Sequence, residues 1–98
     1  MKLRLTLTRL AKLDLDDLIV HIGTDNRRAA VKIGTSILDK IELLKDHPEM
    51  GRRGRRPGTR ELVVEGTHYI VAYRVVPERE QIQILRILHT SRLWPEQL

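Results

Sequence analysis

The chain of 98 residues contains no cysteine and no phenylalanine. The lack of cysteine excludes disulfide bonds and thiolate metal sites, and it suits a reducing compartment, so we expect the protein in the cytoplasm. Without phenylalanine, the core must be built from Leu, Ile and Val, with Tyr69, Tyr73 and Trp94 as the only aromatic residues. No apolar run approaches the roughly 20 residues of a membrane span, and the first residues lack a secretory signal. We therefore expect no membrane partner.

Positive charge is in excess over negative charge. The sequence has 18 lysines and arginines against 13 aspartates and glutamates, which gives a net charge of +5. This balance favours anionic partners such as nucleic acid or an acidic protein segment, although an ordinary soluble basic protein also shows it. The length allows one hydrophobic core, so we expect residues 1–98 to form a single domain.

The first half of the chain shows one strand pattern followed by two helix patterns. Alternating Leu and polar residues predict a strand over residues 2–8. Apolar residues three and four apart then predict a helix that starts near Arg9, a stop followed by a fresh cap within residues 23–26, and a second helix over residues 27–45. The turn between them is short, so we expect an antiparallel helical hairpin. The expected core-facing positions are Ala11, Leu15, Leu18, Ile19, Ile22, Ala30, Ile33, Ile37, Ile41 and Leu44.

A second apolar set on the first helix faces away from the expected core. Leu10, Leu13 and Val20 fall on the opposite side of the helix, mixed with Asp17 and His21. A helix that packs on a small sheet does not need this second set. These residues are either ordinary exposed residues, or they lie under a neighbouring helix, or they form a docking surface for a partner chain.

The second half of the chain is typical of three strands preceded by a basic loop. Val, Ile and Tyr dominate residues 62–64, 69–76 and 81–88, and the short turns between them predict an antiparallel meander. The alternation slips at residues 85–87. Residues 51–60 contain three glycines, one proline and five arginines, which predicts an irregular loop. The predicted fold class is α+β, with the order β-α-α-β-β-β and the helical hairpin on one face of a mainly antiparallel, twisted sheet.

Four segments, taken in order, resemble a known family. They are residues 14–26, which begin Asp-Leu-Asp-Asp-Leu-Ile; residues 37–52, with Ile-Leu-Asp-Lys-Ile-Glu-Leu-Leu and His-Pro-Glu-Met-Gly-Arg; residues 58–75, with Gly-Thr-Arg-Glu-Leu-Val-Val and Tyr-Ile-Val-Ala-Tyr-Arg-Val; and residues 84–95, with Ile-Leu-Arg-Ile-Leu-His, Arg92 and Trp94-Pro95. This set covers nearly the whole chain and resembles the RelE/ParE superfamily of toxins from bacterial type II toxin–antitoxin pairs. The resemblance implies the same fold and a cognate antitoxin whose extended, partly acidic tail wraps the toxin. A homodimer or a hetero-oligomer with the antitoxin is left open.

The superfamily that the chain resembles has two activities. ParE-like members inhibit DNA gyrase without known chemistry, whereas RelE-like members enter the ribosome and cut mRNA with basic residues and usually a C-terminal tyrosine. For a nuclease, the resemblance points to Arg60, His89 and Arg92. No tyrosine follows Arg92, and arginines replace the lysines expected ahead of Arg60. These departures favour the ParE-like branch, with no catalytic residue. The alternatives are a RelE-like endoribonuclease and a non-toxic basic module that binds nucleic acid.

The residues expected to contact the antitoxin or the target are basic, with one tryptophan. Each has a structural alternative: the loop arginines can be solvated, His89 hydrogen-bonded, Arg92 salt-bridged and Trp94 packed on the sheet edge. The histidines lack the spacing of metal ligands, so we expect no metal site and no cofactor. The expected contact set is Arg52, Arg53, Arg55, Arg56, Arg60, Arg74, His89, Arg92 and Trp94.

Overall fold

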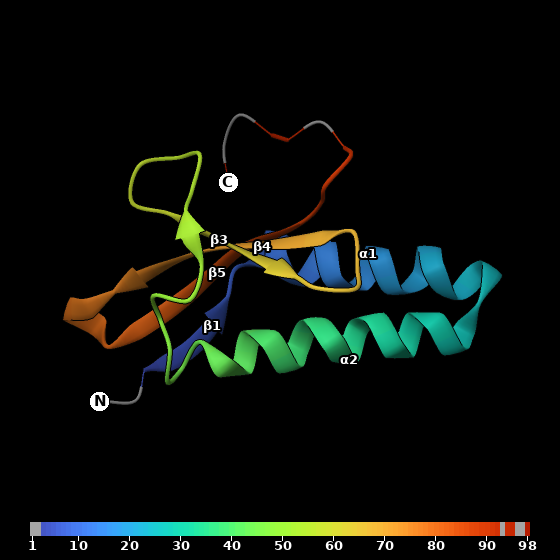
Figure 1. Cartoon of the computed structure of the whole chain (residues 1–98), viewed down its shortest axis with the longest axis horizontal. Coiled ribbons are helices and arrows are strands. Elements are labelled where there is room, and N and C mark those ends of the chain that lie inside the picture. Colours follow the sequence, from blue (N-terminus) through green and yellow to red (C-terminus); the bar gives the residue numbers. More distant parts are fainter. Residues whose placement is uncertain (1–2, 93, 96–97) are drawn as a thin grey trace.

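The computed structural model describes residues 3–92, 94, 95 and 98. Two antiparallel helices lie side by side against a five-stranded sheet (Figure 1). The elements are β1 (Arg4–Leu7), α1 (Arg9–Asp25), α2 (Arg27–Leu43), β2 (Arg52–Arg53), β3 (Arg60–Val64), β4 (Tyr69–Val76), the 3₁₀ turn η1 (Pro77–Arg79) and β5 (Gln81–His89). The predicted strand start at Lys2 lies outside the described residues. Within them, neither helix is long and apolar enough to cross a bilayer.

Both helices begin at a polar cap. Thr8 Oγ1 accepts the Ala11 N–H at 3.1 Å at the start of α1. Asn26 has an extended backbone, with φ −154° and ψ 97°, and its N–H still donates to the last turn of α1. Its Oδ1 accepts the Ala29 N–H at 3.0 Å and so begins α2. One asparagine therefore ends the first helix and starts the second, which keeps the hairpin tight.

The first helix ends within the predicted segment, and the second ends early. The stop and fresh cap are predicted within residues 23–26, and α1 ends there, at Asp25 with Asn26 as its cap. Gly23 itself does not stop the helix, since a glycine costs a helix only about 1 kcal/mol relative to alanine. The second helix ends at Leu43, two residues early. Its chain turns there with the His47 N–H bonded to Leu43 O at 3.0 Å, since Pro48 disfavours helical backbone at His47.

The sheet has the strand order β1-β5-β4-β3-β2. The β1–β5 pairing is parallel and the other three pairings are antiparallel, which confirms the mainly antiparallel α+β prediction. The helical hairpin and the strands β2, β3 and β4 lie between β1 and β5 in the chain, which gives the long connection that a parallel pairing requires. The predicted slip in the third strand is a β-bulge: Ile84 pairs with Tyr73 and Arg86 with Ala72, so Leu85 has no partner on β4.

The segment expected to be an irregular loop contains one short strand. In β2, Arg52 pairs with Glu61 at the start of β3. The prediction of a wholly irregular segment is therefore wrong for two residues, and the element order gains a strand to become β-α-α-β-β-β-β. Neither residue of β2 is glycine or proline, and the preceding Gly51 is fixed because its N–H donates to the Tyr73 hydroxyl at 2.9 Å.

The core lies between the two helices and one face of the sheet. Tyr69, Val71 and Tyr73 alternate toward the helices, and the two tyrosines are 8% and 0% exposed, which confirms their predicted core packing. Burial raises the pKa of Tyr73 above its ordinary value. Ile19, expected in the core, is instead 38% exposed and lies against Gly34 of α2. The buried helix residues of the core are Ala11, Leu18, Ile37, Ile41 and Leu44, with Leu15, Ile22 and Ile33 packed at its margin.

The second apolar set of α1 is exposed. Leu10 and Leu13 are each 45% exposed, and Val20 is 69% exposed. These side chains do not lie under α2, so that alternative is wrong. The set leaves an apolar stripe on the outer side of the hairpin.

Candidate functional site

Residues 51–60, called the arginine loop below, are closed by their own hydrogen bonds. The Gly54 N–H donates to Thr59 O at 2.8 Å, and the Thr59 hydroxyl and N–H donate to Arg56 O at 2.7 and 3.2 Å. Gly58 has φ +76°, a backbone angle that residues with a side chain rarely adopt. The arginine loop therefore has a fixed shape, and a hollow of about 600 Å³ lies along it.

The carboxylate of Glu61 holds the arginine loop from inside. Glu61 is 4% exposed, and its Oε2 accepts the Arg55 N–H at 2.8 Å while its Oε1 accepts Arg52 Nη2 at 3.2 Å. Arg55 Nε lies 3.7 Å from the same Oε2. A buried charge requires both an opposite charge and hydrogen bonds. The arginine loop supplies both, so Glu61 and the loop order one another.

One carboxylate cannot neutralise two guanidinium groups, so the arginine loop keeps positive charge. The side chains of Arg52 and Arg55 remain 58% and 55% exposed. Arg53 and Arg56 are exposed too, and neither forms an ion pair with a carboxylate within the described part of the chain. The loop arginines thus form two classes, one that is partly neutralised and one that keeps its full charge.

The C-terminal residues pack on the arginine loop. The Arg55 guanidinium lies over the Trp94 ring, with 3.7 Å between Cζ and the ring centroid. Arg56 Nη2 donates to Pro95 O at 3.1 Å. Trp94 is half-buried, and its indole N–H has no hydrogen-bond partner among the described residues. The packing of Trp94 on the sheet edge stays a prediction, and the contact that the structure shows is with Arg55 of the arginine loop.

Arg60 lies far from the other two nuclease candidates. Its Nη1 donates to Gly51 O at 2.8 Å, so it supports the base of the arginine loop. Arg60 pairs with Tyr73 on β4, whereas His89 pairs with Tyr69. Four residues along the sheet and two strand spacings separate the two Cα atoms by about 16 Å. The structure does not bring Arg60 together with His89 into one site.

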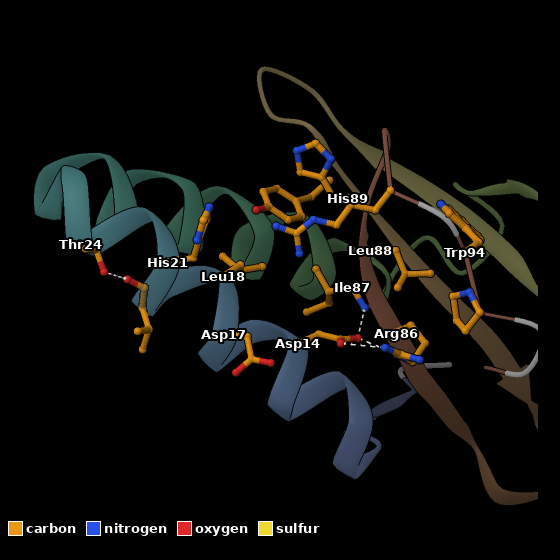
Figure 2. A pocket seen from close by; sticks show the side chains of 14 residues that line it. Asp14, Asp17, Leu18, His21, Thr24, Arg86, Ile87, Leu88, His89 and Trp94 are labelled. Atoms are coloured by element: carbon orange, nitrogen blue, oxygen red, sulfur yellow. Dashed lines mark hydrogen bonds and ion pairs between the residues drawn. The ribbon is translucent and has the colours of Figure 1, made fainter.

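His89 and Arg92 line a pocket of about 830 Å³ between α1, the end of β5 and the C-terminal residues, called the α1–β5 pocket below (Figure 2). Asp14 fixes one wall. Its two oxygens accept Arg86 Nε and Nη2 at 2.7 and 2.9 Å, and Oδ2 also accepts the Ile87 N–H at 2.9 Å. The bond from Asp14 holds the pKa of Arg86 above its ordinary value. The guanidinium of Arg86 is therefore neutralised within the wall.

His89 is a neutral ring at the edge of the α1–β5 pocket. Partial burial, and then the positive charges of Arg92, His68 and His21, lower the pKa of His89. The Ser91 N–H donates to Nδ1 at 3.2 Å, and Ser91 Oγ lies 2.8 Å from the same atom. With Nδ1 accepting these bonds, the neutral ring carries its proton on Nε2. The lone pair of Nδ1 then points at the Ser91 N–H rather than into open space, and a neutral imidazole is a weak acid.

The α1–β5 pocket is better suited to binding than to phosphoryl chemistry. Asp17 stands on its wall beside Asp14, and the carboxylate of Asp17, which no cation pairs with in the described residues, repels a phosphodiester. Arg92 is the basic group beside them that no carboxylate pairs with in the described residues. No three His, Asp or Glu side chains in the described ranges are grouped to hold a metal ion.

Arg74 belongs to neither the pocket nor the loop backbone. It lies exposed on the sheet face that carries no helix, and its Nε donates to Gln83 Oε1 at 2.7 Å. The predicted contact residues therefore form two groups. One surrounds the arginine loop and the adjacent sheet face, and the other lines the α1–β5 pocket.

Two organising residues were missed by the sequence analysis. Glu61 is the one acid in the run of residues 61–64 and follows five arginines directly, a pattern that marks a candidate internal ion pair. Asp14 had no comparable signal, because it is one of three aspartates within four residues of α1. Its partner Arg86 lies 72 residues away in the chain, and only the fold brings them together.

The sequence and the fold both match known toxins. The family model described as ParE toxin of type II toxin–antitoxin system, parDE, matches residues 5–94. Y4kP of Sinorhizobium fredii, a protein whose name classes it as a toxin, is 33% identical over 97 residues, which is 99% of this chain and 96% of that protein.

Solved structures show the same fold. The chromosomal ParDE toxin–antitoxin system from P. aeruginosa aligns with a TM-score of 0.82 at 29% identity, over 92% of this chain and 98% of that chain. The RelBE2 toxin–antitoxin complex from Mycobacterium tuberculosis aligns with a TM-score of 0.70 at 25% identity, over 91% and 99%. The E. coli RelE toxin, at 15% identity and a TM-score of 0.53, over 93% and 87%, shares the fold alone. Because the family model spans nearly the whole chain and the fold agrees, the protein belongs to the ParE toxin family of type II toxin–antitoxin systems.

Proposed function

We propose that this toxin inhibits DNA gyrase by binding it in the cytoplasm, with no catalytic residue of its own. The observation that carries the proposal is the separation of the nuclease candidates, since Arg60 and His89 lie about 16 Å apart across the sheet. The Ser91 N–H also occupies His89 Nδ1. General acid–base catalysis needs both groups within hydrogen-bond reach of one substrate. An inhibitor that binds needs only a fixed surface, and the arginine loop and its neighbours supply one.

Purified gyrase supplies the test. Titration of the toxin into a supercoiling assay is expected to abolish supercoiling, and the cognate antitoxin is expected to restore it. The double variant H89A/R92A is expected to inhibit gyrase to within about threefold of the wild type, because neither side chain performs chemistry. Full supercoiling at a large excess of folded toxin would end the gyrase proposal.

A cognate antitoxin is the partner that neutralises the toxin, and it covers the apolar stripe of α1. Two of the similar structures are of toxin–antitoxin systems. Val20 is 69% exposed and Leu13 45% exposed, and a chain that folds on binding gains affinity by covering such a stripe. In binding titrations with the protein encoded by the neighbouring reading frame, L13D/V20D is expected to lose at least 100-fold in affinity. The control Val63→Asp, at a 41% exposed apolar position on β3, is expected to bind normally.

A RelE-like, ribosome-dependent endoribonuclease is the second candidate. The observation in its favour is that His89 and Arg92 share the pocket of about 830 Å³. Primer extension on mRNA after induction decides it. Codon-phased ends that appear with the wild type and vanish with H89A/R92A would establish cleavage, and the gyrase proposal expects none.

A further inference from the structure

The strongly basic residues in the second half of the chain are all arginines. After Glu49 the chain has nine arginines and no lysine, whereas all five lysines lie in the first 45 residues. An arginine presents a rigid fork of donors that matches two oxygens of a phosphate, whereas a lysine presents a single compact charge. A surface that only needed solubility would have no reason to exclude lysine. The composition therefore points to recognition of planar or tetrahedral oxyanions on the sheet side.

Two of these arginines are positioned without losing their charge. Arg56 and Arg74 line one hollow of about 550 Å³ beside Thr8. Arg74 donates through Nε to the Gln83 amide at 2.7 Å, and Arg56 donates through one Nη to Pro95 O at 3.1 Å. Both acceptors are neutral, so each guanidinium is held in place with its full charge and with free N–H groups. This contrasts with Arg86, whose fork is spent on a carboxylate.

The same sheet face carries further positive charge. In the register of the strands, Thr6, Gln83 and Arg74 form one row on the face without helices. Arg52 lies on that face as well, opposite the buried Glu61, which is shared between two arginines. The face therefore combines hydrogen-bond donors with an uncompensated cationic rim.

The occupant is a phosphate backbone rather than unstacked bases or a protein. Proteins that bind single strands stack bases on exposed aromatic rings, but Tyr69 and Tyr73 are buried and Arg55 covers Trp94. A folding protein segment needs apolar surface to cover. Seven of the nine exposed large apolar residues in the described ranges belong to the helices: Leu10, Leu13, Ile19, Val20, Val31, Leu38 and Leu43. The sheet side thus offers charge and hydrogen bonds with little apolar area.

We infer that the sheet face around Arg56 and Arg74 binds the phosphodiester backbone of duplex DNA, without reading its sequence. Contacts to phosphates fix position but carry no sequence information. The inference deepens the proposed function, on which its biological meaning rests. Under this inference, the toxin engages gyrase that has DNA bound rather than free gyrase.

Fluorescence anisotropy with a 20-base-pair duplex tests the binding directly. If four phosphates are contacted, affinity is expected to fall about 100-fold between 50 and 200 mM salt. The variant R56A/R74A is expected to bind more weakly and to reduce the slope of log K against log salt by about 1.8. R56K/R74K keeps the charge and is expected to recover most of that slope. The matched control is R27A/R28A, which removes two exposed arginines at the start of α2 and is expected to bind within threefold of the wild type.

Three results would overturn the inference. The first is no binding of the duplex. The second is equal weakening of binding by R56A/R74A and R27A/R28A, which would reduce the effect to net charge. The third is binding of a poly-glutamate peptide as tight as that of the duplex at the same salt, which would assign the face to an acidic protein segment. Circular dichroism on each variant confirms that loss of binding is not loss of fold.

The gyrase assay separates this inference from the proposed function. If the toxin reaches gyrase through DNA, R56A/R74A is expected to require about tenfold more protein for half-inhibition than R27A/R28A. A wild-type toxin that binds duplex DNA but leaves gyrase active would remove the proposed function and keep the DNA surface. Equal inhibition by both variants, with no duplex binding, would remove the DNA surface and keep the gyrase proposal.

Discussion

Asp14 and Glu61 perform the same structural task at two places on the sheet, with opposite electrostatic results. Each carboxylate accepts one backbone N–H and guanidinium donors. Asp14 meets one arginine in a closed fork, and both side chains are about five-sixths buried, at 16% and 17% exposure. Glu61 meets two arginines that remain more than half exposed. The number of arginines per carboxylate, rather than the presence of an ion pair, therefore decides whether a region stays cationic.

The largest effect is expected from Asp14→Asn. The change leaves the mostly buried Arg86 without its counter-charge and weakens the acceptor for the Ile87 N–H, so we expect a loss of about 2–3 kcal/mol in the free energy of unfolding. Urea denaturation measures it. The control Asp16→Asn, at an exposed position on the same helix, should change the free energy by less than about 0.5 kcal/mol. Equal effects of the two substitutions would show that the closed fork contributes nothing specific.

Glu61→Gln is expected to lower the free energy of unfolding less than Asp14→Asn does, but to loosen the arginine loop more. The amide keeps one acceptor oxygen but loses the charge that orders two arginines, so we expect a loss of about 1–2 kcal/mol. The rate of cleavage by trypsin measures how far the loop is loosened, because trypsin cuts after arginine and the arginine loop offers several sites. Cleavage within residues 52–60 should speed up at least tenfold relative to Glu65→Gln, an exposed control. Unchanged cleavage would mean that the loop holds its shape without Glu61.

The contact between Arg55 and Trp94 is expected to contribute less to the free energy of unfolding than the contacts of Asp14 or Glu61. A guanidinium over an indole at a partly exposed site contributes about 0.5–1 kcal/mol. A double-mutant cycle with Arg55→Gln and Trp94→Leu should give a coupling energy in that range. A coupling near zero would show that the C-terminal residues rest on the arginine loop without stabilising it.

The smallest effect concerns His89. Since burial and neighbouring positive charges lower the pKa of His89 in the folded state, the neutral ring contributes stability that is fully present above the ordinary value near 6.5. That stability is lost as the pH falls from the pKa of His89 in the unfolded state to its lower pKa in the folded state. A proton NMR titration should give a pKa for His89 below 6.5, and Arg92→Ala should raise it. Arg27→Ala, at the far end of the hairpin, serves as the control, and an equal rise there would contradict the assignment to Arg92.

Much of the fold follows from local pattern. Thr8 and the stripe from Ala30 to Leu44 behave as periodicity predicts, and even the bulge at Leu85 is visible as a break in alternation. Local pattern also places the end of α1 within residues 23–26, where Asn26 caps the helix. It fails where a more distant partner decides, since two arginines of the basic segment form a strand because β3 offers them backbone hydrogen bonds.

The candidate site was less predictable, because its organisation depends on contacts between distant residues. Charge alone marked the arginines, but it could not separate Arg56 and Arg74, held by neutral acceptors, from Arg52 and Arg55, which share Glu61. Charge also could not reveal that Arg60 and His89 lie on different strands and pair with positions of β4 that are four residues apart. The sequence therefore identifies the charged residues, and the tertiary structure decides which of them are paired with an opposite charge.

Induction of the toxin in growing cells tests most directly whether it acts by binding gyrase or by cutting RNA. The two readouts are a reporter of the DNA-damage response and the incorporation of labelled amino acid into protein. If the toxin acts by binding gyrase, growth arrest with an early DNA-damage response is expected while translation continues, for the wild type and for H89A/R92A alike. Immediate arrest of translation without DNA damage, abolished by H89A/R92A, would contradict inhibition by binding.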